Sequence, residues 1–305
     1  IVILALYIFD QPDFFTVYGP QSLFNQIITL CIVALGQTIV ILTAGIDLSV
    51  GAIVGFANSL AATIMVPLTK SLGGDGMGIV VTCLIVLVCG LVMGAVNGLI
   101  VVFGRLQPII VTLATSSIYL GISLYVRPSP GGAVPDGFST FLTGNVFGAI
   151  PVSALVLVLF VLVGWIPVRN SRLGQSLYAV GGNEASAYMS GISVKKAKFM
   201  AYALSGVFCA CAGLLLTAQT ASGDPLGSEG FTLDSIAAVV LGGTSLFGGI
   251  GSYYGTIAGA SIISLIAGLL IFWNVSSFYQ SLVSGIILIV AIGLSAWRGK
   301  KSIPA

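Results

Sequence analysis

Long runs without any charged residue restrict this chain more than any other feature of its sequence. Seven runs contain no Asp, Glu, Lys or Arg: residues 14–46, 48–69, 76–104, 106–126, 137–168, 199–223 and 235–297. Each can cross a hydrocarbon core about 30 Å thick, which takes about 20 helical residues, and the last has room for two or three crossings. Only 7% of all residues are charged, against about 25% in soluble domains, so the surface must face lipid.

The spans are predicted to be helices, because backbone polar groups inside a bilayer must be satisfied within the segment. A β-barrel would need a period of two residues, which Ile79–Leu99 does not show. We therefore predict an all-α polytopic membrane protein, with residues 1–305 forming a single transmembrane domain of about ten spans. The predicted spans lie near 1–9, 22–43, 50–68, 79–103, 107–126, 151–168, 199–220, 233–247, 251–273 and 279–297. The first is too short to cross and is expected to be truncated at its N-terminus.

Basic residues predict the orientation of these spans. Ten spans place both ends of the chain on the same side of the membrane. With the ends inside, nine of the eleven Lys and Arg residues are cytoplasmic, and only Lys70 and Arg127 lie outside. Because cytoplasmic loops carry the excess of Lys and Arg, both termini are predicted to be cytoplasmic.

Two glycine-rich stretches form a weak internal sequence repeat, called the echo below. Residues 43–55 and 247–259 match at five of thirteen positions when one is shifted by 204. Transporters are commonly built from repeated halves, and glycine-interrupted segments at corresponding positions point to the pathway. We therefore predict internally repeated halves, with chance matching in a chain of 40 glycines as the alternative. Each stretch also holds a Gly-x3-Gly pair that is expected mainly to let helices pack closely: Gly51/Gly55 and Gly255/Gly259.

Neutral polar groups along the spans are candidates for lining a path. A neutral, hydroxyl-rich solute could pass such groups without being held tightly. The candidate pathway residues are Gln37, Thr38, Gly45, Asp47, Ser49, Asn58, Asn97 and Gly249. Hydrogen bonding between helices explains the same polar groups equally well. Asp47 and Ser49 have a further alternative role as caps of the helix that follows them.

Catalytic motifs are missing from the sequence. It has no P-loop of the form G-x4-G-K-[ST], no nucleophile elbow and no histidine, so we predict neither an enzyme nor a metal site. A transport protein without an ATP-binding motif of its own must draw energy from an ion gradient or from a separate ATPase. A secondary transporter or facilitator of a small neutral solute therefore stays open as the alternative.

One polar segment, Gly181–Ile192, interrupts the apolar chain between two long spans. Such a segment is expected to present itself to a partner in the cytoplasm. Asn183 is predicted to cap a short helix, with Glu184 near its N-terminus, where a negative charge is favourable. The basic residues that follow, Lys195, Lys196 and Lys198, are expected to be solvated.

Several motifs together resemble the ribose-type ABC importer permease family. They are G-I-D-L-S-V-G at Gly45–Gly51, the segments Gly181–Glu184 and Ser190–Ile192, and Leu233–Leu246, in this order along nearly the whole chain. The resemblance implies an inner-membrane permease subunit of a bacterial importer that moves a monosaccharide from periplasm to cytoplasm. The implied partners are a second permease (identical or paralogous), cytoplasmic ATP-binding subunits and a periplasmic sugar-binding protein. The sugar stays open among ribose, fructose, galactose, xylose and furanose-type substrates, as does the signalling sugar derivative that a related branch of importers carries.

The resemblance also implies that the loop at about 169–198 holds a coupling helix that docks on the ATPase. The residues implied to couple are Gly181, Gly182, Asn183, Glu184, Ala185, Ser190 and Gly191. ATP and Mg are implied on the partner ATPase, with no cofactor on this chain. The loop departs from the family's E-A-A pattern, because Gly191 lies one position late and Ser186 replaces an Ala. On the outer side, Arg127–Gly148 and residues 221–232 are the candidate contacts for the binding protein.

Overall fold

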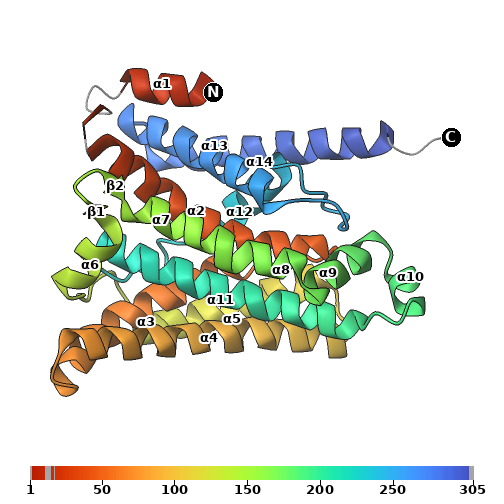
Figure 1. Cartoon of the computed structure of the whole chain (residues 1–305), viewed down its shortest axis with the longest axis horizontal. Coiled ribbons are helices and arrows are strands. Elements are labelled where there is room, and N and C mark those ends of the chain that lie inside the picture. The colour runs from red at the N-terminus through yellow and green to blue at the C-terminus, as the bar shows by residue number, and fades with distance from the viewer. Residues whose placement is uncertain (1, 11–14, 17, 302–305) are drawn as a thin grey trace.

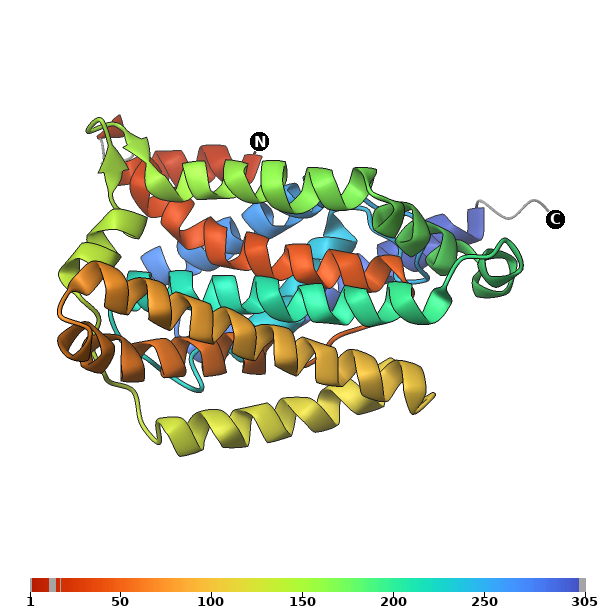
Figure 2. The ribbon, with the colours of Figure 1, turned by 60° about the horizontal axis from the view of Figure 1, so that its bottom comes forward.

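The computed structural model describes residues 2–10, 15–16 and 18–301, and these form a helical bundle (Figure 1). The elements are α1 (Val2–Asp10), α2 (Tyr18–Leu42), α3 (Val50–Ser71), α4 (Asp75–Phe103), α5 (Pro108–Val126), α6 (Asp136–Thr143), β1 (Asn145–Val146), β2 (Ile150–Pro151), α7 (Val152–Leu159), the π-helix η2 (Phe160–Trp165), α8 (Ile166–Asn170), α9 (Arg172–Gly182), α10 (Glu184–Met189), α11 (Val194–Thr220), α12 (Gly230–Leu241), α13 (Tyr253–Phe272) and α14 (Ser277–Lys301). Helices α9 and α10 lie at one end of the bundle, the α10 end, and α6 with the β1–β2 hairpin lies at the other, the α6 end (Figure 2).

Seven helical segments among the described residues are long and apolar enough to cross a membrane. They are α2, α3, α4, α5, the continuous α7–η2–α8 unit, α11 and α13. Each coincides with a predicted span to within a few residues, so the prediction of an all-α polytopic protein is confirmed. The agreement follows from the charge-free runs, since a backbone inside lipid has few ways other than a helix to satisfy its polar groups.

The core of the bundle forms around α2 and α11. Helix α11 packs against α2, α3 and α4, while α13 packs against α2 and α12. Buried aliphatic residues from α2, α3 and α11 meet in one hydrophobic cluster, which includes Leu35, Ile39, Ile53 and Ala212. Helix α5 contacts α3 and α4 and lies along one edge of the bundle, in yellow in Figure 2.

The predicted span 233–247 is wrong in its extent. Helix α12 ends at Leu241, and residues 242–252 form an irregular loop. At about 1.5 Å per residue, the 12 residues of α12 make a helix only about 18 Å long, too short to cross a bilayer. The helix stops because the loop contains glycines with positive φ, a conformation that a right-handed helix excludes: Gly243, Gly248, Gly249 and Gly251.

Residues 221–232 do not stay at the surface as the sequence analysis expected. After α11, the chain passes along α3 into the bundle: Asp224 N donates to Asn58 Oδ1 (2.6 Å), and Ser228 Oγ donates to Gly51 O (2.9 Å). Asn58 and Gly51 are about two helical turns apart on α3, so this segment descends about 10 Å. Helix α12 therefore begins partway across the bundle and ends toward the α10 end.

Both Gly-x3-Gly pairs of the echo pack against this descending segment and α12. An ideal Cβ on any of the four glycines would overlap atoms of Ser228, Pro225, Gly242 or Ala238. The predicted packing role of the pairs is thus confirmed, and α12 is held between α3 and α13. The helices α3 and α13 begin at Val50 and Tyr253. The separation of these two helix starts differs by one residue from the 204-residue shift that relates the two echo stretches.

The two segments predicted as outer contacts meet at the α6 end. Gly131 N donates to Gly223 O (2.9 Å), and Gly223 N donates to Gly131 O (2.8 Å). The segment Arg127–Gly148 is more structured than its Gly, Pro and Ser content suggested, because it contains α6 and the first strand of the β1–β2 hairpin. The pairing places parts of both segments on one surface.

Candidate functional site

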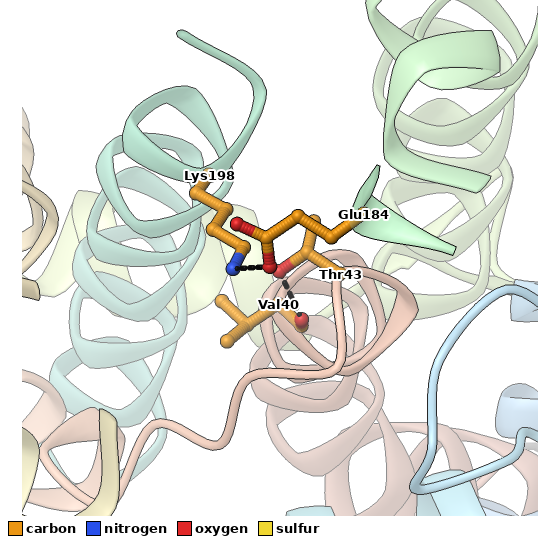
Figure 3. A network of polar contacts seen from close by, with 4 residues as sticks. All are labelled: Val40, Thr43, Glu184 and Lys198. Atoms are coloured by element: carbon orange, nitrogen blue, oxygen red, sulfur yellow. Dashed lines mark hydrogen bonds and ion pairs between the residues drawn. The ribbon is translucent and has the colours of Figure 1, made fainter. Parts of the chain in front are cut away.

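Helix α10 begins as the sequence predicted. Asn183 caps it, with its Oδ1 accepting a hydrogen bond from Ser186 N (2.8 Å). Glu184, in the first turn, forms an ion pair with Lys198 of α11 at 2.5 Å (Figure 3). The expectation that Lys198 is simply solvated is therefore wrong. Since the Glu184 side chain is 56% exposed, the pair contributes less than about 1 kcal/mol to stability and serves to orient α10.

Most residues implied in coupling lie on the surface of the α10 end. Gly181 is half-buried, whereas the others are exposed: Gly182, Asn183, Glu184, Ala185, Ser190 and Gly191. Two large side chains of α10 that the sequence analysis missed are also exposed, Tyr188 by 74% and Met189 by 79%. Their exposure makes these two side chains candidates for contact with a partner. Their signal in the sequence was an aromatic residue and a methionine inside a polar loop.

Gly181 brings α9 into contact with the loops that follow α2 and α12. An ideal Cβ on Gly181 would overlap the carbonyl oxygen of Leu42 and would lie 2.5 Å from Gly249 N. Gly249 N itself donates to Leu42 O (3.1 Å), and the Tyr178 hydroxyl of α9 donates to Gly251 O (2.7 Å). Nothing in the sequence indicated that a coupling residue meets an echo segment, but Gly181 lies directly against Gly249.

The hydroxyl groups of Tyr178 and Thr43 both donate hydrogen bonds where α9 meets the end of α2 and the loop after α12. Burial raises the pKa of the Tyr178 phenol, and the positive charge of Arg169 offsets the rise in part, so the phenol stays protonated and can donate. Beyond the end of α2, the Thr43 hydroxyl donates to Val40 O (2.8 Å), as Figure 3 shows together with the Glu184–Lys198 pair. Through Gly181 and Tyr178, α9 thus contacts the end of α2 and the loop after α12.

Asp47 lies in a buried polar network between α3, α4, α5 and α11. Its Oδ1 accepts from Ser49 N (3.0 Å) and Ser49 Oγ (2.7 Å), and its Oδ2 accepts from Ser205 Oγ (3.3 Å). Asn97 Nδ2 donates to Ser49 Oγ (2.7 Å), and the Tyr119 hydroxyl lies 3.2 Å from Asn97 Oδ1. The network fixes the loop 43–49 against three helices.

The capping role considered for Asp47 is observed, because its carboxylate accepts a hydrogen bond from Ser49 N at the start of α3. The capping role considered for Ser49 is not observed. Ser49 precedes α3 with φ −90° and ψ −5°, and its side chain makes no capping hydrogen bond. A capping residue needs an extended backbone to turn its side chain toward the N–H groups of the first turn. Because Ser49 is already helical, its hydroxyl is directed to Asp47 and Asn97 instead.

The other candidate pathway residues are also enclosed by the subunit. Thr38 shares a hydrogen bond with Thr256 of α13 (2.9 Å), and Asn58 Nδ2 donates to Thr217 of α11 (2.9 Å). An ideal Cβ on Gly45 would lie 2.6 Å from the Tyr202 hydroxyl, so Gly45 is there to admit that side chain. The structure thus brings Gly45, Asp47, Ser49 and Asn97 to one region, while Thr38, Asn58 and Gly249 contact other parts of the bundle.

Gln37 is fully buried, and neither of its side-chain polar atoms has a hydrogen-bond partner among the described residues. A buried amide without partners costs about 1–3 kcal/mol. Gln37→Met, which keeps the shape and removes the amide, is therefore expected to raise the free energy of unfolding by about 1 kcal/mol. Thermal unfolding in detergent measures the change.

Asn97→Leu is the matched control, because it removes an amide whose hydrogen bonds to Ser49 and Tyr119 are made. This variant should be less stable than the wild type by about 1–3 kcal/mol. A Gln37→Met protein that loses as much stability as Asn97→Leu would contradict the prediction.

Known proteins resemble this chain over nearly its full length. Residues 19–292 match the family described as branched-chain amino acid transport system / permease component. The ribose import permease protein RbsC of Haemophilus influenzae is 36% identical over 99% of this chain and 93% of its own length. RbsC of Bacillus subtilis is 38% identical (92% and 86%), and the galactose/methyl galactoside import permease protein MglC of Salmonella typhimurium is 37% identical (98% and 92%). No solved structure matches the chain.

These relatives cover the motifs at Gly45–Gly51, Gly181–Ile192 and Leu233–Leu246, so the resemblance seen in the sequence is confirmed. Among the described residues, no three His, Cys, Asp or Glu side chains come together in a way that could hold a metal ion. The spanning helices and the length of the match point to the same conclusion: the chain belongs to the family of transport-system permease components.

Proposed function

We propose that this chain is the membrane-spanning permease subunit of an ATP-driven importer that brings a monosaccharide into the cytoplasm. One observation carries the proposal: import permeases named for ribose and galactose are 36–38% identical to it over at least 86% of their lengths. The family's description names branched-chain amino acids. The individual relatives are far more specific than the family description, and they favour a sugar.

The α10 end is the cytoplasmic side in this proposal. It carries the basic residues that follow α4 and surround α9 and α10, including Arg105, Arg172 and Lys195, and α14 ends toward it (Figures 1 and 2). Cytoplasmic segments are enriched in such residues. If α1, the descending segment together with α12 (residues 221–241), and α14 are counted as membrane segments beside the seven long spans, ten segments would place both termini in the cytoplasm.

The ATP-binding subunit would dock on α10. The exposed Tyr188 and Met189 provide apolar contact area, and buried Ala187 fixes the helix against the bundle. Aromatic anchors of this kind dominate binding energy at protein interfaces. Gly181 and Tyr178 would then pass a movement of the ATPase to the loops after α2 and α12, where both connect to spanning helices.

The periplasmic sugar-binding protein would dock at the α6 end. The Gly131–Gly223 pairing joins the two candidate contact segments there. Phe147, at the tip of the β1–β2 hairpin, is 95% exposed and offers an aromatic anchor. The buried polar residues, Asp47 and Asn97 among them, would support the wall of the pathway from inside the subunit.

Reconstitution tests this function against the alternative of a secondary transporter. The chain is placed in vesicles together with an ATP-binding subunit and a solute-binding protein of a sugar importer, and uptake of labelled ribose and galactose is followed with and without ATP. Uptake that requires ATP and both partners is the expected result. Uptake by the purified chain alone, driven by an imposed ion gradient, would overturn the proposal.

A further inference from the structure

Glu229 is an exposed carboxylate that lies at the level of the middle of α5. It directly precedes α12 and lines a groove together with residues from the middle of α5, Leu113, Ser116 and Leu120. The start of α3 and the loop before it complete the groove through Ala52 and Leu48. Residues 221–232 were predicted to lie on the outer side, but the descent of this segment along α3 brings Glu229 inward.

The depth of the groove follows from α5. This helix has 19 residues, and at about 1.5 Å per residue it is about 28 Å long, close to the thickness of the hydrocarbon core. Arg105 and Arg127 flank it on either side, where basic side chains can reach the two polar surfaces of the bilayer. Ser116 lies near the centre of α5, so the groove and Glu229 lie near the middle of the membrane.

A carboxylate at this depth cannot face lipid without a large cost. The Glu229 side chain has no ion pair and no hydrogen bond with any described residue, so nothing in the subunit neutralises it. Ionisable groups within spans normally face a water-filled cavity or a partner. The groove face of the subunit therefore does not border lipid in the assembled protein.

The lining of the groove suits a neutral solute rich in hydroxyl groups. Its volume is about 290 Å³, at the lower end of small-molecule sites. Ser116 and Thr232 supply hydroxyl groups, and the Ser116 hydroxyl has no partner among the described residues. Leu113 and Leu233, 58% and 50% exposed, supply apolar surface for the C–H face of a sugar ring. The lining holds no Lys or Arg that would attract the carboxylate of an amino acid.

We propose that the groove between α5 and α12 is the sugar-contacting surface of this subunit at the middle of the membrane, with Glu229 accepting hydrogen bonds from sugar hydroxyls. This assignment rests on the proposed function. Leu48 connects it to the buried network, because Leu48 lies between Asp47 and Ser49 and its N–H donates to Thr112 of α5 (3.0 Å). The hydrogen bonds of Asp47, Ser49 and Thr112 thus hold the Leu48 side of the contact surface in place.

Thiol labelling tests whether the groove holds water. Ser116→Cys places a thiol in the groove, and Val88→Cys places one near the middle of α4, where Val88 is 57% exposed. In the assembled complex in vesicles, a charged, membrane-impermeant thiol reagent is expected to label Ser116→Cys at least about tenfold faster than Val88→Cys, since thiolates form in water and not in lipid. The wild-type chain, whose five cysteines are buried or half-buried, is the blank. Equal rates for the two variants would overturn the groove assignment.

Transport by Glu229 variants tests the contact with sugar. Glu229→Leu is expected to reduce ATP-dependent uptake of ribose or galactose about 10- to 100-fold, the loss that follows removal of a hydrogen bond to a charged group. Glu229→Gln keeps an accepting oxygen and should retain most of the uptake. ATP hydrolysis without sugar should continue in both variants, which shows that the complex has assembled.

The outcomes separate this inference from the function on which it rests. Wild-type uptake by Glu229→Leu would overturn the role of Glu229 and leave the importer function standing. A wild-type complex that moves neither sugar would overturn the proposed function, while the labelling rates still report whether the groove is open to water.

Discussion

Replacing Gly181 with alanine is expected to abolish sugar uptake and to lower the free energy of unfolding by about 1–3 kcal/mol, the usual cost of overpacking. The new Cβ would overlap the Leu42 carbonyl oxygen, and a backbone atom cannot move aside as a side-chain tip can. Helix α9 would have to shift away from the loops after α2 and α12. Uptake in vesicles and thermal unfolding in detergent measure the two effects.

Gly182→Ala is the control on the neighbouring residue. A Cβ on Gly182 meets no atom within 4 Å, and alanine favours a helix over glycine by about 1 kcal/mol. This variant should therefore be as stable as the wild type or slightly more stable. Because the added methyl meets no atom of the subunit, uptake should also stay normal, which runs against the coupling role that the resemblance implies for Gly182. Equal effects of the two substitutions would show that the close approach of Gly181 is not what matters at this junction.

Removing the two exposed side chains of α10 is expected to abolish binding of the ATPase. Tyr188→Ala and Met189→Ala should each weaken the complex by about 30-fold, which corresponds to the roughly 2 kcal/mol lost when an anchor residue is truncated. The double variant should fail to stimulate ATP hydrolysis at any practical concentration. The permease should remain folded, because both side chains are mostly exposed and support no core.

Tyr125→Ala provides the comparison at the opposite end. Tyr125 is 90% exposed near the α6 end of α5, so it matches Tyr188 in size and exposure but not in position. Its removal should leave the affinity for the ATP-binding subunit unchanged, as measured by titration of the purified proteins. If Tyr125→Ala and Tyr188→Ala weaken the complex equally, the docking surface is not α10.

The positions of the spanning helices could be predicted because each one satisfies a condition local to its own residues. Val50–Ser71 and Asp75–Phe103 are helical because lipid accepts no other backbone for stretches so free of charge. Asn183 likewise caps α10 by accepting a hydrogen bond from Ser186 N, only three residues further along the chain. Such features depend on neighbours in the sequence, so a single chain reveals them.

The partners of the polar residues depend on contacts between distant segments and could not be predicted. Asp47 was considered as a cap, but it also accepts a hydrogen bond from Ser205, 158 positions away. Glu229 was placed outside, yet the packing of residues 224–232 against glycines of α3 draws it to the level of the middle of α5. Nothing in the sequence around either carboxylate records these contacts.

By itself, the sequence determined that this chain spans a membrane as helices, where most of them begin and end, and which family it resembles. Only the tertiary structure decided that Gly181 contacts the end of α2 and the loop after α12, that Tyr188 and Met189 are exposed, and that Glu229 lines a groove at the level of the middle of α5. The physical reason is that hydropathy acts on each segment separately, whereas close packing and the placement of charge depend on how the segments fit together.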